Sequence, residues 1–424
     1  MPASVTPRLD DPAEIDALFA PVAAYPAIGL AVSGGADSLA LMLLAQSWAS
    51  AAPGRPRLQV YSVDHGLRPE AAGEVAMVLV AAKALGIAAT GLRWEGDKPK
   101  TGVQEAARIA RYRLMGAAMA ADGVPALLTA HHRNDQAETL LMRLAHGSGI
   151  EGLKGMAPVA NVENVRVYRP LLNCAPGDLH DLVLAAGLVP AQDPSNHDEH
   201  YERVRWRKAL PQLAELGLDA ETLARFALRM GEADAAIARV ADEEFAALVV
   251  LDGFGSARLE LASFVDLSPA VATRVLGRVL KIVGGRQKPR ALGLVERLQQ
   301  TLYAGGAGKG VTALGCVVRT HDGAIIVARE PGRALPRDAA IPPHSQLLWD
   351  ERFLIINNSD MAGITAGIAD YLPRHRLQEF LGFKVTAPAE AIRTAPIVRN
   401  AEGGVLSLGG WSFDERIEVQ LLID

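Results

Sequence analysis

Six residues near the N-terminus, Ser33-Gly34-Gly35-Ala36-Asp37-Ser38, combine glycine, hydroxyl and carboxylate groups in one short loop. Glycines allow consecutive backbone N–H groups to point into one concavity, which suits a phosphate. A helix that starts near Asp37-Ser38 would add its positive end. The loop lacks the third glycine of a Rossmann fingerprint and the lysine of a Walker A loop. The alternative is an ordinary strand-to-helix turn, in which the glycines serve only for tightness.

Two histidines and two carboxylates follow the apolar run ALLTA (126–130), in the segment HHRNDQAET. Asp135 and Glu138 are three residues apart, so a helix would place them on one face. Such a pair can hold an ammonium group, and a carboxylate can accept a proton from an attacking amine, because only the neutral amine is nucleophilic. His131 and His132 could act beside a phosphate, serve as a core residue and a cap, or join the carboxylates in a metal site.

Arg108 and Arg111 lie three residues apart in the helical pattern of residues 103–121. Glu105 precedes Arg108 by three positions, and pairing on a solvated helix face would explain both residues. The functional alternative places at least one arginine on a phosphate that gains charge during a reaction. The spacing alone leaves both interpretations open.

Two further segments are rich in basic residues. Arg203, Arg205 and Arg207 are interleaved with aromatic residues, which is typical of nucleic-acid binding, although alternate arginines could also form one face of an edge strand. Residues 271–329 carry ten basic and two acidic residues, in a chain whose formal net charge is -5. This excess indicates a phosphate-binding surface. At its middle is the run GRQKPR, which contains Arg286, Lys288 and Arg290.

These side chains need a scaffold that brings them together. Residues 26–130 alternate strand-like runs (AIGLAV, LQVYSVD and ALLTA) with helical patterns at 38–50, 71–85 and 103–121. The alternation predicts a parallel α/β sheet with helices on both faces. Ligands bind at the carboxyl ends of the strands in such sheets, so the clusters SGGADS, DHGLRP and HHRNDQAET should converge on one crevice.

The rest of the chain predicts two further domains. Residues 216–330 are mostly helical, and residues 330–346 carry four prolines and have the composition of a linker. Short strands such as FLIINN and RIEVQLLI then predict a small α+β domain over residues 345–424. With a first domain over residues 1–215, the length of 424 residues fits this division.

Composition argues against several classes of protein. Only Cys174 and Cys316 are present, without a CxxC pair, so neither a structural zinc ribbon nor a dithiol redox site is supported. The N-terminal segment is acidic and broken by proline, unlike a signal peptide, and no apolar run reaches transmembrane length. We expect a soluble cytoplasmic protein that does not enter membranes, and a homodimer is compatible with the sequence.

The loop at Ser33-Gly34-Gly35-x-Asp37-Ser38, after an apolar strand, resembles the pyrophosphate loop of the N-type ATP pyrophosphatases, whose fold is adenine nucleotide alpha hydrolase-like. The later segments follow the order of the bacterial tRNA(Ile)-lysidine synthetases: SVDHGLRPEA, TGVQEAARIARYRLM, LLTAHHRNDQAETLLMRLAHGSGIEGLKGM, VYRPLL and DPSNHDEHYERVRWR. The resemblance runs from about residue 28 to residue 211. Two positions depart from that family's pattern: Asn134 stands for an aspartate and Val204 for an asparagine.

This resemblance implies roles for individual residues. The loop would hold the pyrophosphate of ATP, with Asp37 beside Mg²⁺. The residues that bind ATP would be Ser33, Gly34, Gly35, Asp37, Ser38 and His65. The catalytic residues would be Asp37, Arg108, Arg111 and His132. Lysine would be recognised by Asp135 and Glu138, and tRNA by Arg203, Arg205, Arg207, Arg286, Lys288 and Arg290.

The activity implied by the resemblance is the ATP-dependent ligation of L-lysine to C2 of the wobble cytidine (position 34) in the CAU anticodon of tRNA(Ile). ATP would adenylate the C2 carbonyl oxygen, and the ε-amino group of lysine would displace AMP to give lysidine. The base must be splayed out of the anticodon loop to be reached. Two alternatives remain: a tRNA 2-thiolase of the same superfamily, which would need catalytic cysteines, and a non-catalytic RNA-binding protein on the same scaffold.

Overall fold

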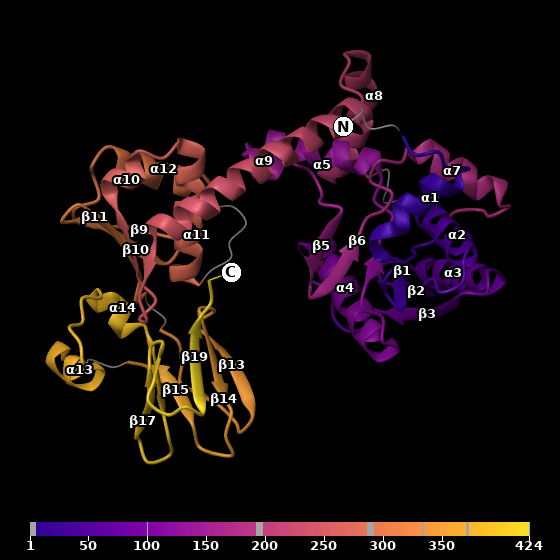
Figure 1. The fold of residues 1–424 in the computed structure, drawn as a ribbon. Helices are drawn as coiled ribbons and strands as arrows, with labels where there is room; N and C mark the ends of the chain where they lie inside the picture. The colour runs from indigo at the N-terminus through magenta and orange to yellow at the C-terminus, as the bar shows by residue number, and fades with distance from the viewer. Residues whose placement is uncertain are drawn as a thin grey trace. The chain divides into compact units, whose positions relative to one another are not determined.

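The computed structural model describes residues 6–99, 101–191, 198–285, 292–332, 335–369 and 373–423. The chain divides into two compact units, Met1–Asp234 and Ala235–Asp424 (Figure 1). Within the described ranges, no helix has both the length and the apolar composition needed to cross a membrane. Three residues expected to bind RNA fall outside those ranges: Arg286, Lys288 and Arg290.

The first unit is built on a six-stranded sheet. Its strands are β1 (Ala27–Ala31), β2 (Arg57–Asp64), β3 (Ala88–Arg93), β4 (Leu127–Leu128), β5 (Val159–Val162) and β6 (Val165–Tyr168). Their order is β3-β2-β1-β4-β6-β5, and all neighbours are parallel except the β5–β6 hairpin at the edge. The predicted parallel α/β sheet is confirmed.

Helices cover both faces of this sheet, which buries its apolar side chains on each side. One face carries the helices α1 (Pro12–Phe19), α2 (Ala36–Ser50), α3 (Ala71–Ala84) and α7 (Pro176–Ala185), with the short 3-10 helix η1 (Ala20–Val22) after α1. The opposite face is covered by α4 (Val103–Asp122).

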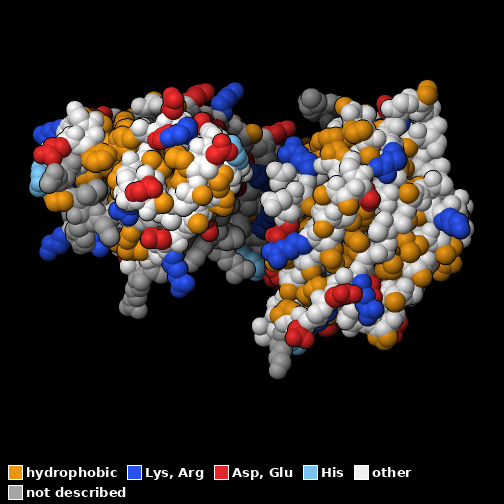
Figure 2. Space-filling view, turned by 90° about the horizontal axis from the view of Figure 1, so that it is seen from below, with side chains coloured by type: hydrophobic (Ala, Val, Ile, Leu, Met, Phe, Trp, Pro, Cys, Tyr) orange, Lys and Arg blue, Asp and Glu red, His pale blue; other side chains and the backbone are white. Residues whose placement is uncertain are grey.

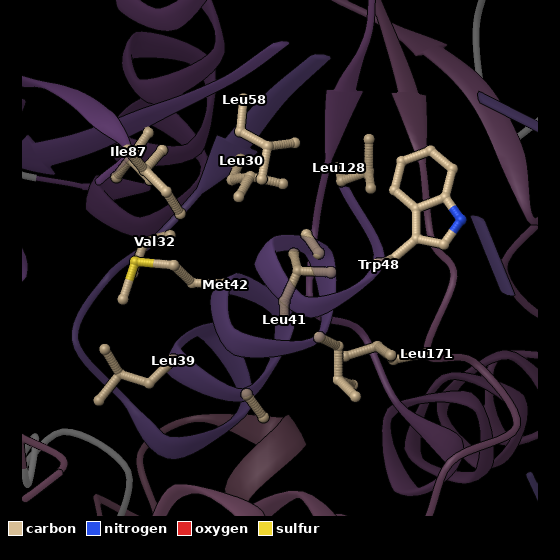
Figure 3. Packing of buried hydrophobic residues seen from close by; sticks show 14 of the residues in the cluster. Leu30, Val32, Leu39, Leu41, Met42, Trp48, Leu58, Ile87, Leu128 and Leu171 are labelled. Carbon is tan, nitrogen blue, oxygen red and sulfur yellow. The ribbon is translucent and has the colours of Figure 1, made fainter. Parts of the chain in front are cut away.

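Helix α2 is the most buried helix around the candidate site, because it packs between the sheet and α7. Leu41 and Met42 of this helix belong to the same apolar cluster as Leu30 of β1 and Leu128 of β4 (Figure 3). Each of these four side chains is fully removed from solvent. The packing holds the start of α2 against the carboxyl ends of β1 and β4, where ligands bind in such sheets.

Three further helices of the first unit pack against one another through one buried cluster. They are α5 (Arg133–Ala145), α8 (Glu202–Glu215) and the start of α9 (Ala220–Leu248), with the single turn α6 (Ile150–Leu153) after α5. The alternative of an edge strand is therefore wrong, because a helix carries Arg203, Arg205 and Arg207.

The second unit begins with a mostly helical part, as predicted, which packs on a small antiparallel sheet. Its helices after α9 are α10 (Leu261–Val265), α11 (Pro269–Gly284) and α12 (Leu292–Tyr303). Its strands are β7 (Val250–Leu251), β8 (Ala257–Glu260), β9 (Val311–Ala313), β10 (Cys316–His321) and β11 (Ala324–Arg329). The strand order is β7-β8-β11-β10-β9, and α11 supplies much of the buried cluster.

The remainder of this unit forms two small sheets, β12-β15-β16-β17-β18 and β13-β14-β19. The strands are β12 (Ala339–Ala340), β13 (Ser345–Trp349), β14 (Phe353–Asn357), β15 (Thr365–Ile368), β16 (Pro396–Arg399), β17 (Val405–Leu408), β18 (Trp411–Ser412) and β19 (Ile417–Leu421). The helices are α13 (Arg374–Leu381) and α14 (Ala389–Arg393). Phe254 and Ala328 share a buried cluster with Ile397 and Leu408, so these strands pack on the preceding part of the same unit.

Candidate active site

The loop between β1 and α2 is shaped by its own side chains. Ser38 Oγ accepts a hydrogen bond from Ser33 N–H (3.1 Å) and donates one to Gly35 O (2.9 Å). Gly34 O accepts a hydrogen bond from Ala191 N–H (2.9 Å). Gly35 precedes the first turn of α2 and has no side chain to cap it. The N–H groups at the start of α2 are therefore left for an anion, which the helix dipole also favours.

The two glycines of this loop serve different purposes. Gly34 has a φ of +90°, where an L side chain is strained, and a Cβ there would lie 3.1 Å from Met77 Cε. Gly35 has a φ of -70°, which any residue adopts, and the closest atom to a Cβ there would be Ser33 Oγ at 3.9 Å. The backbone therefore requires glycine at position 34, whereas Gly35 leaves open space at the helix start.

His132 joins the loop to the carboxylate cluster. It follows β4 as the N-cap of α5, and its Nε2 lies 3.6 Å from Asp37 Oδ2 and 3.5 Å from Asp135 Oδ2. Asp135 Oδ2 also accepts a hydrogen bond from His132 N–H (2.9 Å). Burial acts to lower the pKa of His132, but Asp37 and Asp135 outweigh burial and raise that pKa above its ordinary value. The residues after β1 and β4 thus meet at one place, where two carboxylates lie near the same nitrogen of an imidazole.

The predicted carboxylate pair lies against two arginines of α8. Glu138 is fully buried, and it accepts hydrogen bonds from Arg203 Nε at Oε2 (2.6 Å) and from Arg207 Nε at Oε1 (2.7 Å). Asp135 Oδ1 accepts a hydrogen bond from Arg203 (2.9 Å). Burial acts to raise the pKa of Asp135, but His132 and Arg203 hold it below its ordinary value. Arg205, on another face of α8, instead donates to the backbone oxygens of Glu199 and His200.

His131 is held differently from His132. Its Nδ1 lies 2.9 Å from Thr129 Oγ1, so this ring nitrogen has a partner. Burial is the main reason why the pKa of His131 is lowered to about 4, and the arginines at positions 169, 203 and 111 contribute to this value against the opposing charge of Asp135. The imidazole of His131 is therefore uncharged at neutral pH.

The predicted residues Arg108, Arg111 and His65 lie at the edges of this cluster. Arg108 is nearly half exposed, and its guanidinium is 3.7 Å from the Glu105 carboxylate, as on an ordinary helix face. Arg111 is more buried, and its charge acts on both His65 and His131. Burial is the main reason why the pKa of His65 is lowered, and Arg111 adds to it. Of the two predicted arginines, Arg111 is the better placed toward the histidines.

The chemistry of the donor set limits which metal the site can hold. Among the described residues, no three His, Cys, Asp or Glu side chains gather as a cation site. Asp37, with its side chain 40% exposed in the first turn of α2, is a carboxylate at the start of the phosphate-binding helix. Mg²⁺ is usually held by one or two carboxylates and substrate phosphates, so this residue fits Mg²⁺ only together with a phosphate.

The basic surface predicted for residues 271–329 is smaller than the sequence count indicates. Three of its arginines bind carboxylates of the second unit: Arg278 with Asp242, Arg319 with Glu390, and Arg329 with Asp350. On the face shown in Figure 2, basic, acidic and hydrophobic side chains are interspersed. Lys281, Arg297 and Lys309 are exposed. A charge count therefore overstates what is available to a nucleic acid.

Two residues of the site, Thr129 and Arg169, were missed by sequence reasoning. Thr129 directly follows β4 and orients His131, and Arg169 directly follows β6 in the run VYRPLL. Both positions are at carboxyl ends of parallel strands, where ligands bind. Recognition of β6 as a strand would have pointed to Arg169, since the run VRVY alternates buried and exposed residues.

The parallel sheet, the glycine loop after its first strand and the uncapped helix that follows define a PP-loop protein, and the family model described as "PP-loop domain" matches residues 8–214. The tRNA(Ile)-lysidine synthase of Bradyrhizobium sp. BTAi1 is 42% identical over 337 residues, which cover 76% of this chain and 94% of that protein. The tRNA(Ile)-lysidine synthase of Rhodopseudomonas palustris is 46% identical, over 67% of this chain and 82% of that protein. The chain belongs to the tRNA(Ile)-lysidine synthase family.

Among solved structures, a U34-tRNA thiolase from Methanococcus maripaludis is similar to part of this chain. The sequence identity is 14% and the TM-score is 0.45, over 52% of this chain and 78% of that one.

Proposed function

We propose that this protein uses ATP to ligate L-lysine to C2 of the wobble cytidine (position 34) in the CAU anticodon of tRNA(Ile), giving lysidine, AMP and pyrophosphate. Membership of the tRNA(Ile)-lysidine synthase family supports the reaction. The observation that carries it in the structure is the bridge from Asp37 through His132 to Asp135, because it joins a phosphate-binding loop to a cluster of carboxylates. A ligase that adenylates one substrate and presents an amine to it needs these two parts side by side.

In the adenylation step, the C2 carbonyl oxygen of the cytidine attacks the α phosphate of ATP and pyrophosphate departs. The N–H groups at the start of α2, together with Ser33 and Gly34, hold the departing pyrophosphate. His132 lies beside the same loop, and Asp37 and Asp135 raise its pKa, which favours the protonated imidazole that phosphates attract. Arg111, with Arg108 further out, stabilises charge on the α phosphate. When bound at Asp37, Mg²⁺ would neutralise part of the phosphate charge.

In the second step, the amine of lysine forms a bond to C2, and the bond between C2 and the adenylated oxygen breaks with its electron pair leaving on AMP. Asp135 lies where it can accept the proton that the amine loses. Lysine binding at Asp135 and Glu138 requires a change, because Arg203 occupies both carboxylates in this structure. The Arg203 side chain is 39% exposed, so it can turn outward and give its place to an ammonium group.

Binding of tRNA would draw on arginines that the carboxylates do not engage. Arg205 is exposed on α8, and the hydrogen bonds it makes to described residues go to the backbone oxygens of Glu199 and His200, so its charge remains available to a phosphate. The segment with Arg286, Lys288 and Arg290 is a second proposed contact, and residues 345–424 form the proposed third domain. The proposed site of action is the cytoplasm, where tRNA is modified. That the protein forms a homodimer stays a prediction.

The test is a ligation assay with purified protein, ATP, Mg²⁺, labelled lysine and tRNA(Ile) bearing the CAU anticodon. Lysine label should enter the tRNA with release of AMP, and Asp37→Asn should reduce the rate by at least about 10-fold, as expected for the loss of a carboxylate that holds Mg²⁺ beside the phosphates. Asp181→Asn, an exposed carboxylate on α7, is the matched control. No label in tRNA with the unaltered protein would rule out the proposal, and transfer of sulfur instead would favour the thiolase.

A further inference from the structure

Arg169 is a buried cation for which the described residues supply no anion. Only 7% of its surface is exposed, and its NH1 donates a hydrogen bond to Ala157 O (2.7 Å). Its Nε is buried without a hydrogen-bond partner. Among the described residues, no carboxylate lies within ion-pair distance of this guanidinium, and burial lowers its pKa. A buried charge without a partner is costly, so such a residue is retained where a ligand brings the opposite charge.

The position of Arg169 at the sheet edge places it inside the candidate site. It follows β6, which pairs in parallel with β4, and Thr129 N–H donates to Tyr168 O across that pair (3.0 Å). Arg169 therefore lies beside the carboxyl end of β4. In the segment that continues from β4, His131 is two residues beyond the position opposite Arg169. The electrostatic effect of Arg169 on His131 reflects this proximity.

The groups around Arg169 make this part of the site strongly cationic. Arg108 and Tyr112 of α4 are its charged or titratable neighbours. The charges of Arg169, Arg111 and Arg203 all act on His131, whereas Asp135 is its acidic neighbour. Arg203 is already bound to carboxylates, so Arg169 and Arg111 are left without a described anion. The excess of positive charge around Arg169 favours a ligand that carries several negative charges.

We propose that Arg169 binds a nucleotide phosphate in the site, either the α phosphate of ATP or a phosphodiester of the RNA next to the reacting base. A guanidinium presents two parallel N–H groups that match two phosphate oxygens, which a lysine cannot do. The phosphate compensates the buried charge only when substrate is bound. The identity of this phosphate rests on the proposed function. The presence of an anion at Arg169 does not depend on it.

The test compares Arg169→Met, Arg169→Lys and a control, Arg166→Met. Arg166 is exposed on β6, three residues before Arg169, and its NH1 is 3.5 Å from Asn161 Oδ1. Each protein is examined by thermal unfolding without ligand, by binding of an α,β-methylene analogue of ATP, and by binding of a labelled anticodon stem-loop of tRNA(Ile). The last two measurements separate the two sources of phosphate.

Arg169→Met should unfold at the same or a higher temperature, because an unpaired buried charge is gone. Affinity for the ATP analogue or for the stem-loop should fall by about 10- to 100-fold, as for the loss of a charge-assisted hydrogen bond. Arg169→Lys should retain part of the affinity, and Arg166→Met should change neither. If Arg169→Met fails to fold, Arg169→Lys decides through its two affinities.

A lower unfolding temperature with both affinities unchanged would overturn the inference and make Arg169 a structural residue that supports Ala157. Unchanged affinity in both variants would overturn it as well. If the unaltered protein binds ATP and RNA through Arg169 but forms no lysidine, the proposed function fails while the phosphate role of Arg169 stands.

Discussion

Arg203 Nε lies 2.6 Å from Oε2 of Glu138, a carboxylate that is completely buried. Arg207 takes the other oxygen of the same group at 2.7 Å. The carboxylate thus links α5 to α8 and fixes the positions of the two arginines. It is also part of the proposed lysine site. Four consequences of the site geometry can be measured.

Glu138→Gln should destabilise the protein by about 2–4 kcal/mol, because it removes the charge that compensates two guanidinium groups. Both arginines are partly exposed, at 39% and 42% of their side chains, and can regain water, which keeps the loss below the upper limit for a buried pair. Denaturant unfolding measures the effect. Glu199→Gln, an exposed partner of Lys208, is the control and should leave the unfolding midpoint where it was. Equal midpoints for all three proteins would contradict the structural role of Glu138.

Gly34→Ala and Gly35→Ala should separate stability from phosphate binding. Alanine at position 34 must adopt a φ of +90° and meet Met77, so we expect a loss of about 1–2 kcal/mol in unfolding free energy. Alanine at position 35 has an allowed backbone and open space, so stability should be kept. Its methyl group would nevertheless intrude at the helix start and weaken pyrophosphate binding. Full pyrophosphate affinity in Gly35→Ala would show that the anion lies elsewhere.

Stability should fall in mild acid because of His131. Burial lowers its pKa in the folded protein to about 4, whereas the unfolded chain has a value of about 6.5. Between these two values the unfolded chain binds a proton that the folded protein does not. The contribution of the uncharged His131 ring to the free energy of unfolding is therefore fully retained above about pH 6.5 and is lost progressively as the pH falls toward about 4.

Urea unfolding at about pH 7 and about pH 5 measures this linkage. His131→Asn keeps a partner for Thr129 but does not titrate in that window, so its loss of stability between the two pH values should be smaller than that of the unaltered protein. The same loss in both proteins would show that other groups, such as the paired carboxylates, account for the acid sensitivity.

Replacement of both cysteines should leave lysine ligation intact. Cys174 and Cys316 are buried in different units, and burial raises the pKa of each thiol to about 12. Neither can form a nucleophilic thiolate at neutral pH. A Cys174→Ala, Cys316→Ala double variant should keep its rate per folded molecule, measured by tRNA labelling at a temperature well below unfolding. Loss of activity in a folded variant would reopen the thiolase alternative.

The strands and helices with strong periodicity were predictable from the sequence. The runs AIGLAV and LQVYSVD became β1 and β2 because they are buried on both faces, and the helical patterns became α2, α3 and α4. β3 was missed, because its residues are only partly buried and its run AATGLR lacks a continuous apolar signal. β6 was missed as well, since four residues are too few to show a period.

Contacts between distant segments could not be predicted in the same way. The sequence shows that Asp135 and Glu138 share a helix face, but it does not show that their partners follow sixty-five residues or more later, on α8. From the sequence alone, the arginines there fit either an RNA-binding stretch or one face of a strand. Only the packing of α5 against α8 reveals that two of them face inward.

Arg203 and Arg207 are four positions apart, which places them one above the other on α8, while Arg205 points elsewhere. A single residue inserted between Arg203 and Arg207 would turn the later arginine by about 100° around the helix axis. That arginine would lose Glu138, although every side chain would still be present. The composition of this segment can therefore vary more readily than its length.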